Sequence, residues 1–462
     1  ENDEPYPLVN PKDGKVVKYV SPRALFDKIV YQAWESAEPG VIFFDRVNDY
    51  NPFYKYLGPI VTTNPCGEVL LYPNEPCNLG SINVWAFARH DDETNENYVD
   101  WDALRVAVRS CTRFLDNVID VNNFPLKAIE EMSLATRKIG LGVMGVANLL
   151  YELKLPFNSE EGRAFMEKLM EFVAYWSKIE SIELAKTRGN LPYYDRSFYK
   201  EGRLPIPGPE QGSFNNLNWD KIRKDIRQYG IRNGYTTIIA PTGSISMIAG
   251  CSSGMEPVYS VVFEKNVKVG IFFYIDPAAE KVLREEGLFN ERLLEDINRH
   301  KGSVQNIEYV PENIRKALVT AMDITPEDHI RALAAFQRWT DSSISKTNNF
   351  PANATLEDMR QSYILAYQLG CKDVTVFRDT SIKDQVLVAP KAKPKEEEKI
   401  DVKPEQKKFV KESETGLVFG NGNGNEKPMT KSTIKNCPEC GTLVELKEGC
   451  LHCPGCGWGL CM

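Results

Sequence analysis

The sequence predicts an α/β body, a flexible segment and a small cysteine-rich module, in that order. Helical and strand patterns alternate over residues 1–385, which is typical of α/β architectures. Residues 386–433 are rich in Lys, Glu, Pro, Gly and Asn and contain few large apolar side chains. Residues 434–462 hold six of the eleven cysteines. A chain of 462 residues with 42% apolar residues is long enough for one large domain or several smaller ones.

Helices in the body are predicted from caps and from apolar residues at helical spacing. Ser21 is a typical N-cap, and Pro22 fits the first helical position of a segment that continues to Trp34. Residues 101–121 place an apolar stripe on one face of a helix, made of Leu104, Val108, Cys111, Leu115 and Val118. Cys111 is therefore expected to pack in the core, because a free cysteine behaves as a small hydrophobic residue.

Two strands and a further helix complete the alternation. YTTIIA (235–240) and DVTVF (373–377) are rich in β-branched residues and are predicted to be strands. TLEDMRQSYILAYQLGC (355–371) consists largely of good helix formers and leads into the second strand.

The segment GLGVMG (140–145) has the spacing of a dinucleotide-binding loop but not its context. Such a loop follows a buried strand, whereas the preceding EEMSLATRK (130–138) is polar and helical in pattern. Close packing of backbone or helices against Gly140, Gly142 and Gly145 is the better interpretation.

The segment TTIIAPTGSISMIAG (236–250) predicts a strand, a turn and an apolar helix from about residue 246. A turn of this kind directs free backbone N–H groups and the positive end of a helix toward an anion. The residues of the predicted phosphate loop are Pro241, Thr242, Gly243, Ser244, Ile245 and Ser246. An ordinary Ser-capped helix start is the alternative.

The segment TTNPCGEVLLYPNEPCNLGSINV (62–84) carries a pattern with chemical meaning. On an extended backbone, Asn64, Cys66 and Glu68 would share one face. The carboxylate could then exchange a proton with a hydroxyl group that the amide orients. Cys77 could supply electrons by forming a disulfide. A cysteine nucleophile would need a basic histidine, and none of the four histidines has such a setting.

The tail contains two similar knuckles, CPECG (437–441) and CPGCG (453–457). Four thiolates at this spacing make a tetrahedral zinc site that can hold a small module together, here Cys437, Cys440, Cys453 and Cys456. Cys450 and Cys461 would then be free for a redox shuttle. The alternative assigns zinc to Cys437, Cys440, Cys450 and Cys453, and leaves Cys456 and Cys461 as the redox pair.

The charge and composition of the sequence argue against several classes of protein. The net charge of −8 argues against a general nucleic-acid binder. No apolar run approaches the roughly 18 residues that a membrane helix needs. No signal-peptide pattern opens the sequence, so we expect a cytoplasmic protein with reduced thiols. The sequence does not start with Met, which predicts a fragment, a processed product or one half of a split protein.

Several motifs together resemble the ribonucleotide reductases, and more narrowly the adenosylcobalamin-dependent class. They are NPCGE, CNLGSINV, RKIGLGVMG, APTGSIS, AGCSSGMEP, HIRALAAFQRWTDSSISKT and GCKDVTVFRD. The iron-dependent class has a Tyr-Tyr pair where this sequence has Phe377, and the tail lacks the motif of the glycyl-radical class. The resemblance covers residues 1–385.

The resemblance implies a ten-stranded α/β barrel, with a finger loop that carries a cysteine to its centre. Cys66 matches that cysteine, which forms a thiyl radical and takes the 3′ hydrogen of a ribonucleotide. Glu68 matches the general base for the 3′-hydroxyl, Asn64 a ribose ligand, and Cys77 one of two reducing thiols. The turn 241–246 matches the substrate phosphate loop.

The resemblance also implies cofactors and partners. We expect adenosylcobalamin, a structural zinc ion in the tail, a ribonucleotide substrate, a thioredoxin-type reductant and a homodimer partner. The sequence matches only the second part of the catalytic domain, so we expect it to need an upstream N-terminal half. The alternatives are a dehydrogenase built on residues 140–145 and a catalytically inactive nucleotide- or partner-binding protein with a zinc-ribbon tail.

Overall fold

The computed structural model describes residues 3–267 and 270–381, and short segments near the C-terminus (Leu443, 445–447, 450–452 and 459–461). The chain divides into two compact units, Glu1–Lys395 and Glu396–Met462. The second unit contains a three-stranded antiparallel sheet of β14 (Glu445–Lys447), β15 (Cys450–His452) and β16 (Gly459–Cys461). The predicted tether at 386–433 lies outside the described residues, so its boundaries stay predictions.

The first unit is built from the following elements. The strands are β1 (Tyr6–Val9), β2 (Val16–Val20), β3 (Val41–Ile42), β4 (Thr62–Thr63), β5 (Leu70–Leu71), β6 (Leu79–Asn83), β7 (Ala88–Asp91), β8 (Glu96–Val99), β9 (Gly140–Met144), β10 (Val262–Val267), β11 (Gly270–Ile275), β12 (Thr347–Phe350) and β13 (Asp373–Arg378). The α-helices are α1 (Pro22–Ser36), α2 (Phe44–Asp49), α3 (Tyr54–Leu57), α4 (Trp101–Val121), α5 (Lys127–Thr136), α6 (Val146–Glu152), α7 (Glu160–Arg188), α8 (Gly208–Gln211), α9 (Trp219–Tyr229), α10 (Gly243–Ala249), α11 (Pro277–Glu285), α12 (Glu291–Arg299), α13 (Glu312–Ala317), α14 (Pro326–Gln337) and α15 (Leu356–Gln368). The 3₁₀ turns are η1 (Val84–Phe87), η2 (Tyr194–Arg196) and η3 (Phe198–Glu201).

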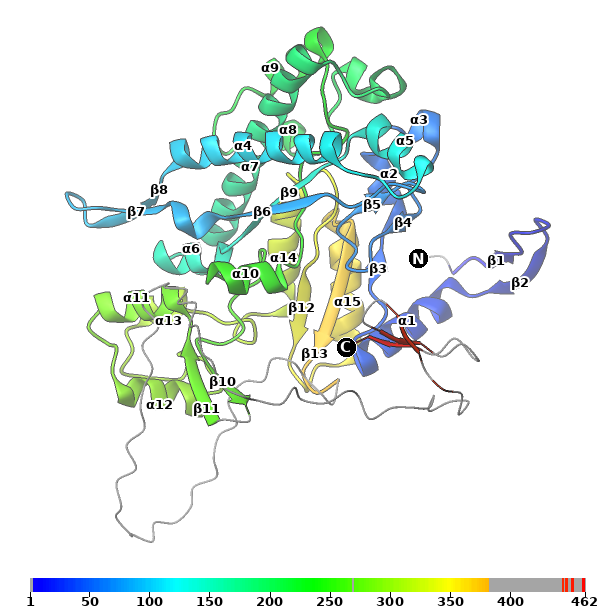
Figure 1. Ribbon diagram of the computed structural model, residues 1–462. Coiled ribbons are helices and arrows are strands. Elements are labelled where there is room, and N and C mark those ends of the chain that lie inside the picture. The colour runs from blue at the N-terminus through cyan, green and yellow to red at the C-terminus, as the bar shows by residue number, and fades with distance from the viewer. Residues whose placement is uncertain are drawn as a thin grey trace. The chain divides into compact units, whose positions relative to one another are not determined.

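A row of parallel strand segments forms the centre of the first unit (Figure 1). β6 pairs in parallel with β9, and β12 pairs in parallel with β13. Parallel bridges join these pairs through the segment 236–240, from Leu141 to Thr237 and from Ile239 to Ile344. The predicted strand YTTIIA is thus present as an extended segment held by single bridges. Helices connect the successive segments, which confirms a mixed α/β architecture.

The helices predicted from Pro22, over residues 101–121 and within residues 355–371 are confirmed, and the predicted Ser21 cap is formed. Ser21 is the N-cap of α1, and its hydroxyl accepts a hydrogen bond from the Ala24 N–H. Thr355 and Asp358 form a capping box at the start of α15. On α4 the predicted stripe faces inward: Leu104, Val108 and Leu115 are buried, and Cys111 is partly buried.

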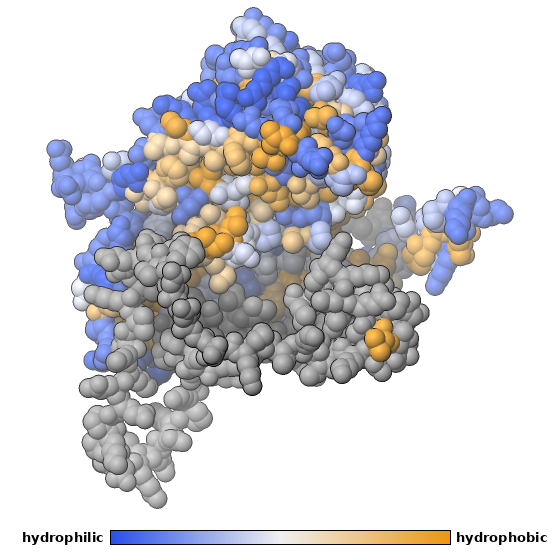
Figure 2. All heavy atoms as spheres, viewed as in Figure 1, coloured by the Kyte–Doolittle hydropathy of each residue, from blue (hydrophilic) through white to orange (hydrophobic). Residues whose placement is uncertain are grey.

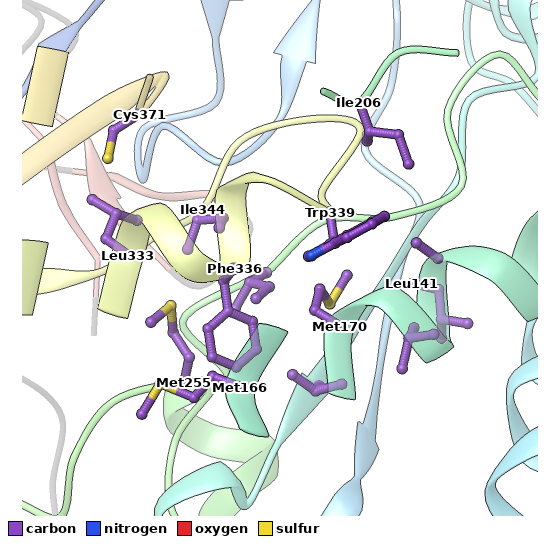
Figure 3. Packing of buried hydrophobic residues seen from close by; sticks show 14 of the residues in the cluster. Leu141, Met166, Met170, Ile206, Met255, Leu333, Phe336, Trp339, Ile344 and Cys371 are labelled. Atoms are coloured by element: carbon purple, nitrogen blue, oxygen red, sulfur yellow. The ribbon is translucent and has the colours of Figure 1, made fainter. Parts of the chain in front are cut away.

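The main hydrophobic core lies between the strand row and the helices α7 and α14. Figure 3 shows part of it, with Met166 and Met170 from α7, Leu333 and Phe336 from α14, and Trp339 and Ile344 from the residues after α14, beside Leu141, Ile206, Met255 and Cys371. A second cluster forms around α11, α12 and α13, with Val282, Leu293 and Ile314 fully buried. These two clusters fix the helices that support the strand ends.

The glycines of GLGVMG allow close packing within the strand row. The motif forms β9 itself, whose five residues are all buried. A Cβ atom at Gly142 would lie 2.5 Å from the carbonyl oxygen of Ile238, and one at Gly140 would lie 2.5 Å from a methyl group of Leu79. The packing interpretation is confirmed, and the motif does not form a loop after a strand.

Apolar side chains remain exposed at several places on the first unit. The hairpin β1–β2 stands apart from the rest of this unit, and Figure 2 shows apolar residues on it and over α4 and α10. The hairpin exposes Tyr6, Leu8, Val9, Val16, Val17 and Tyr19, and α4 exposes Val106, Phe114 and Val121. Among the described helices, none combines the length and apolarity that crossing a bilayer requires.

We predict that Gly142→Ala destabilises the first unit by about 1–3 kcal/mol, the range typical of overpacking a core. The added methyl group would overlap the backbone of the neighbouring strand segment. Urea unfolding should show a lower midpoint. Gly243→Ala is the control, because a Cβ there has no atom within 4 Å, and its midpoint should stay near that of the wild type. Equal midpoints for wild type and Gly142→Ala would contradict the packing interpretation.

Candidate active site

A short hairpin, formed by β4, β5 and the turn 64–69, carries three of the predicted site residues. We call residues 62–71 the finger hairpin. The Asn64 N–H donates to the Val69 carbonyl oxygen (3.3 Å), and Asn64 Oδ1 accepts from the Val69 N–H (2.9 Å). The Gly67 N–H donates to the Asn64 carbonyl oxygen (3.1 Å). The prediction of an extended backbone at 64–68 is therefore wrong, because the Asn64 amide closes this segment into a tight turn.

The turn places the predicted side chains at different depths. Cys66 is exposed at the tip, whereas Glu68 is only 2% exposed. Gly67, between them, has a φ of +83°, a left-handed conformation that favours glycine. The oxygen of Asn64 is used within the turn, which leaves its amide nitrogen for a ligand. The site thus has a thiol at the surface and a carboxyl group beneath it.

The finger hairpin is fixed to the residues that follow α14. The Glu68 carbonyl oxygen accepts hydrogen bonds from the Ser342 hydroxyl (2.8 Å) and the Ser343 N–H (2.9 Å). The Ser342 hydroxyl also accepts from the Leu70 N–H (3.1 Å). Because Ile344 follows directly and bridges Ile239, these contacts tie the hairpin to the parallel strand row.

Glu68 influences both thiols of the site. Partial burial raises the pKa of the Cys66 thiol, and the Glu68 carboxylate raises it further. The same two causes, in the same order, raise the pKa of the Cys77 thiol. Cys77 is exposed and lies two residues before β6. Glu68 therefore lies close enough to act on both, and one of its oxygens, Oε2, has no hydrogen-bond partner among the described residues.

A group of buried charges lies below the finger hairpin. Lys178 on α7 forms an ion pair with Asp341, whose carboxylate also accepts from the Thr236 N–H (2.6 Å). Lys372 donates to the carbonyl oxygens of Asp341 (2.6 Å) and Ser342 (3.1 Å). Burial lowers the pKa of Lys372 to about 8. These groups hold in place the segment that binds Glu68.

The predicted phosphate loop follows the segment 236–240 at the next position of the strand row. Its helix, α10, begins at Gly243, three residues earlier than predicted. Thr242 has a φ of +54°, and its hydroxyl accepts from the Gly254 N–H (2.7 Å). Ser244 and Ile245 are exposed, whereas Ser246 is buried and its hydroxyl lies 2.8 Å from that of Ser253. Ser246 is therefore part of the support, and Ser244 remains accessible to a ligand.

The remaining cysteines divide into body and tail. Cys371 is fully buried and Cys251 is partly buried; burial raises the pKa of Cys251 to about 11. The predicted zinc ligands Cys437, Cys440, Cys453 and Cys456 lie outside the described residues. Cys450 and Cys461 lie opposite each other in the register of β15 and β16.

Sequence reasoning missed the residues that support the site. Ser342 and Ser343 stand in a polar stretch that gives no sign of the backbone contact they make. Lys372 and Asp373 precede a β-branched run, and the only available signal was that two charged residues open a buried strand. A charge at that position must be buried with the strand, which is unusual unless it is paired.

The comparisons with known proteins agree on one family. The profile of "Ribonucleotide reductase, barrel domain" matches residues 2–377. The chain is 40% identical over 412 residues to the vitamin B12-dependent ribonucleoside-diphosphate reductase of Thermoplasma acidophilum, covering 89% of this chain and 48% of that protein. Its identity to the protein of the same name from Mycobacterium tuberculosis (strain CDC 1551 / Oshkosh) is 37%, over 84% of this chain and 51% of that protein. The chain thus spans about half the length of these relatives.

A solved structure shows the same fold. The class Id ribonucleotide reductase alpha subunit of Actinobacillus ureae matches with a TM-score of 0.61, covering 78% of this chain and 61% of that chain. The sequence identity is 24%, so this likeness describes the fold alone.

We predict that Glu68→Gln makes the Cys66 thiol more reactive toward iodoacetamide at pH 8. The carboxylate raises the pKa of that thiol, so its removal lowers the pKa and increases the thiolate fraction. Rates of alkylation measured by peptide mass spectrometry would show the change. Cys111 serves as an internal control, because only burial raises the pKa of its thiol. An unchanged rate at Cys66 would contradict the inferred proximity of the two groups.

Proposed function

Because the chain belongs to the ribonucleotide reductase barrel family, we propose that it supplies the second part of a ten-stranded catalytic barrel that reduces ribonucleotides to deoxyribonucleotides. The finger hairpin is the observation that carries this proposal. It presents the Cys66 thiol at an exposed tip and the buried Glu68 carboxyl group beneath it, and it is hydrogen-bonded to Ser342 and Ser343. The relatives with the highest similarity described above act, by name, on ribonucleoside diphosphates, and we propose the same substrate class.

The protonation of the thiols supports radical chemistry. A hydrogen-atom donor must hold its hydrogen, so the S–H form is the useful one. Burial and Glu68 both raise the pKa of Cys66 and Cys77, which favours that form at neutral pH. A nucleophilic cysteine would need the opposite shift and a basic partner. His329, the buried histidine of the body, is instead bonded to Lys346 and to a backbone carbonyl.

Each residue then has a defined role. As a thiyl radical, Cys66 takes the hydrogen atom from C3′, and Glu68 takes the proton of the 3′-hydroxyl. The amide nitrogen of Asn64 orients the ribose. The 2′-hydroxyl leaves as water, and Cys77 with a second thiol provides two electrons and protons as the pair becomes a disulfide. Cys66 finally returns its hydrogen atom to C3′.

The turn 241–246 is the proposed phosphate site. Its exposed residues, Gly243, Ser244 and Ile245, surround the start of α10, where N–H groups are unpaired within the helix. The hydroxyl of Thr242 and that of Ser246 are bonded to the segment after α10 and hold the turn in shape. We propose that the backbone N–H groups and Ser244 bind the substrate phosphates.

Adenosylcobalamin is the proposed cofactor, and it would supply the radical that Cys66 receives. Two features of the chain fit it. Cys66 is accessible at the hairpin tip, and α10 exposes apolar side chains, including Met247 (76% exposed) and Ile248 (86%). β13 carries Phe377 where a radical-transfer tyrosine pair would stand in the iron-dependent class.

An upstream N-terminal half is the proposed partner. In the described part of the first unit, the remaining cysteines are Cys111, Cys251 and Cys371. They lie on α4, after α10 and before β13, and none of them is assigned as the partner thiol of Cys77. The exposed apolar residues of the hairpin β1–β2 provide a surface for another polypeptide. A homodimer of the completed barrel is compatible with the same surface.

The tail is proposed to bind zinc and to transfer reducing equivalents from a thioredoxin-type protein. The zinc ligands are assigned from sequence spacing alone, as Cys437, Cys440, Cys453 and Cys456. The backbone register of β15 and β16, which sets Cys450 opposite Cys461, supports these two as the redox pair. We therefore assign separate tasks to the two sets, metal binding to the first and thiol–disulfide exchange to the second.

We predict that the chain alone forms no deoxyribonucleotide, and that adding the upstream half and adenosylcobalamin produces it. In this complex Cys66→Ser should abolish activity, because a hydroxyl group is a far poorer hydrogen-atom carrier than a thiol. Glu68→Gln should lower the rate by roughly 10²–10⁴-fold, as expected for loss of a general base. Cys111→Ser on α4 is the matched control and should remain active. Activity that survives Cys66→Ser would refute the proposed function.

We predict different effects for the two sets of tail cysteines. Cys453→Ser and Cys456→Ser should release zinc, measured by atomic absorption on purified protein. Cys450→Ser and Cys461→Ser should keep zinc and one round of reduction but lose repeated turnover with a thioredoxin-type reductant. A small dithiol should restore turnover in part. If Cys450→Ser loses zinc and Cys456→Ser keeps it, the alternative ligand assignment is right.

A further inference from the structure

Asp373, the first residue of β13, lies directly under the finger hairpin. Its side chain is buried, with 3% exposed, and its Oδ2 atom would lie 3.0 Å from a Cβ atom at Gly67. Gly67 separates Cys66 from Glu68, so the carboxyl group of Asp373 forms the floor between the two proposed catalytic residues. The absence of a side chain at Gly67 is what allows this contact.

The neighbours of Asp373 do not neutralise it by an ion pair. Lys372 directs its ammonium group to backbone carbonyl oxygens, and among the described residues no cation lies within ion-pair distance of the Asp373 carboxyl group. Beyond Lys372, Asp341 is already paired with Lys178. The finger hairpin contributes only the negative Glu68.

Two buried oxygen atoms near this floor lack partners. They are Oδ1 of Asp373 and Oε2 of Glu68, for which no hydrogen bond exists among the described residues. A buried oxygen atom without a partner makes the charged form of a carboxyl group costly, and two such carboxylates in one place cost more because their charges repel. A single proton on one of the two carboxyl groups removes the repulsion. Burial raises the pKa of Asp373 to about 8. The Ser343 hydroxyl, the Ile344 N–H and the charge of Lys372 oppose this shift, whereas the Glu68 carboxylate adds to it.

We propose that Asp373 is a positioning residue for the general base Glu68: it carries a proton at neutral pH, forms a neutral floor under the finger hairpin, and leaves the hairpin unstable when it ionises. Ionisation would place a second negative charge beneath Gly67 and push the hairpin away from β13. The positioning role rests on the proposed function, whereas the buried protonated carboxyl group does not.

The raised pKa of Asp373 determines how the stability of the folded chain changes with pH. Asp373 holds its proton to a higher pH in the folded chain than in the unfolded chain. Its contribution to stability is therefore lost as the pH rises toward about 8. Lys372 also titrates near pH 8, and removal of Asp373 would lower its pKa, because Asp373 is one of the groups that raise it. The two residues therefore predict different pH profiles for an Asp373→Asn variant. The alkaline transition disappears if Asp373 is the titrating group and moves to lower pH if Lys372 is.

The first experiment does not depend on enzymatic activity. Infrared spectra of the purified chain at pH 6.5 should show the C=O band of a protonated carboxylic acid, which disappears as the pH passes about 8. Asp373→Asn should lack this part of the band, and Glu308→Gln, a change at an exposed carboxylate, should retain it. A wild-type spectrum without the band, or an unchanged band in Asp373→Asn, would overturn the proposal even if that variant folds poorly.

The second experiment uses the complex with the upstream half. The rate of the wild type, relative to its maximum, should fall above about pH 8, and Asp373→Asn should lose this alkaline decline. If the decline instead moves to lower pH in the variant, Lys372 is the titrating group and the positioning role is wrong. A complex that is inactive throughout, with the infrared result as expected, would count against the proposed function and not against the protonated carboxyl group.

Discussion

The carbonyl oxygen of Glu68 is the acceptor on which the arrangement of the site depends. It receives two hydrogen bonds, from the Ser342 hydroxyl and the Ser343 N–H, and both donors belong to the segment that continues into the strand row. Without them the finger hairpin would keep its own turn and the contacts of Leu70 with the Ser342 hydroxyl and Lys138. A two-residue strand pair such as β4–β5 has little stability in isolation. The position of Cys66 is therefore set by residues about 275 positions later in the chain, Ser342 and Ser343.

The buried charges explain why that segment keeps its place. The Asp341 carboxylate accepts hydrogen bonds from Lys178 and from the Thr236 N–H. Lys372 donates hydrogen bonds to the carbonyl oxygens of Asp341 and Ser342. Such a network is costly to bury and becomes favourable only when its groups are satisfied together. The network connects α7, the segment 236–240 and the residue before β13, and so fixes their positions relative to one another. The finger hairpin rests on the atoms that this network holds.

Local patterns in the sequence predicted the elements well and the site only in part. The Ser21 cap, the stripe on α4 and the strand at 373–378 depend on neighbours within a few residues, so a local reading was sufficient. The turn at 64–69 was predicted as extended because alternation suggested it, whereas the Asn64 side chain closes the backbone. Asp373 and Ser343 could not be recognised, because each contacts the finger hairpin from a segment far away in the sequence. The resemblance to a family supplied what periodicity could not, namely which thiol matters.

Gly67 has a consequence for the gene as well as for the protein. Every amino-acid replacement that a single nucleotide substitution can make in a glycine codon adds a Cβ atom. At this position the backbone is left-handed, and a Cβ atom would lie 3.0 Å from Asp373 Oδ2 and 3.3 Å from a methyl group of Ile42, closer than ordinary contact. A single substitution of the glycine between the Cys66 thiol and the Glu68 carboxyl group is therefore expected to disturb the hairpin. A side chain at this position would require Asp373 or Ile42 to shift by a few tenths of an ångström, so we expect substitutions of Gly67 to be coupled to changes at these two residues.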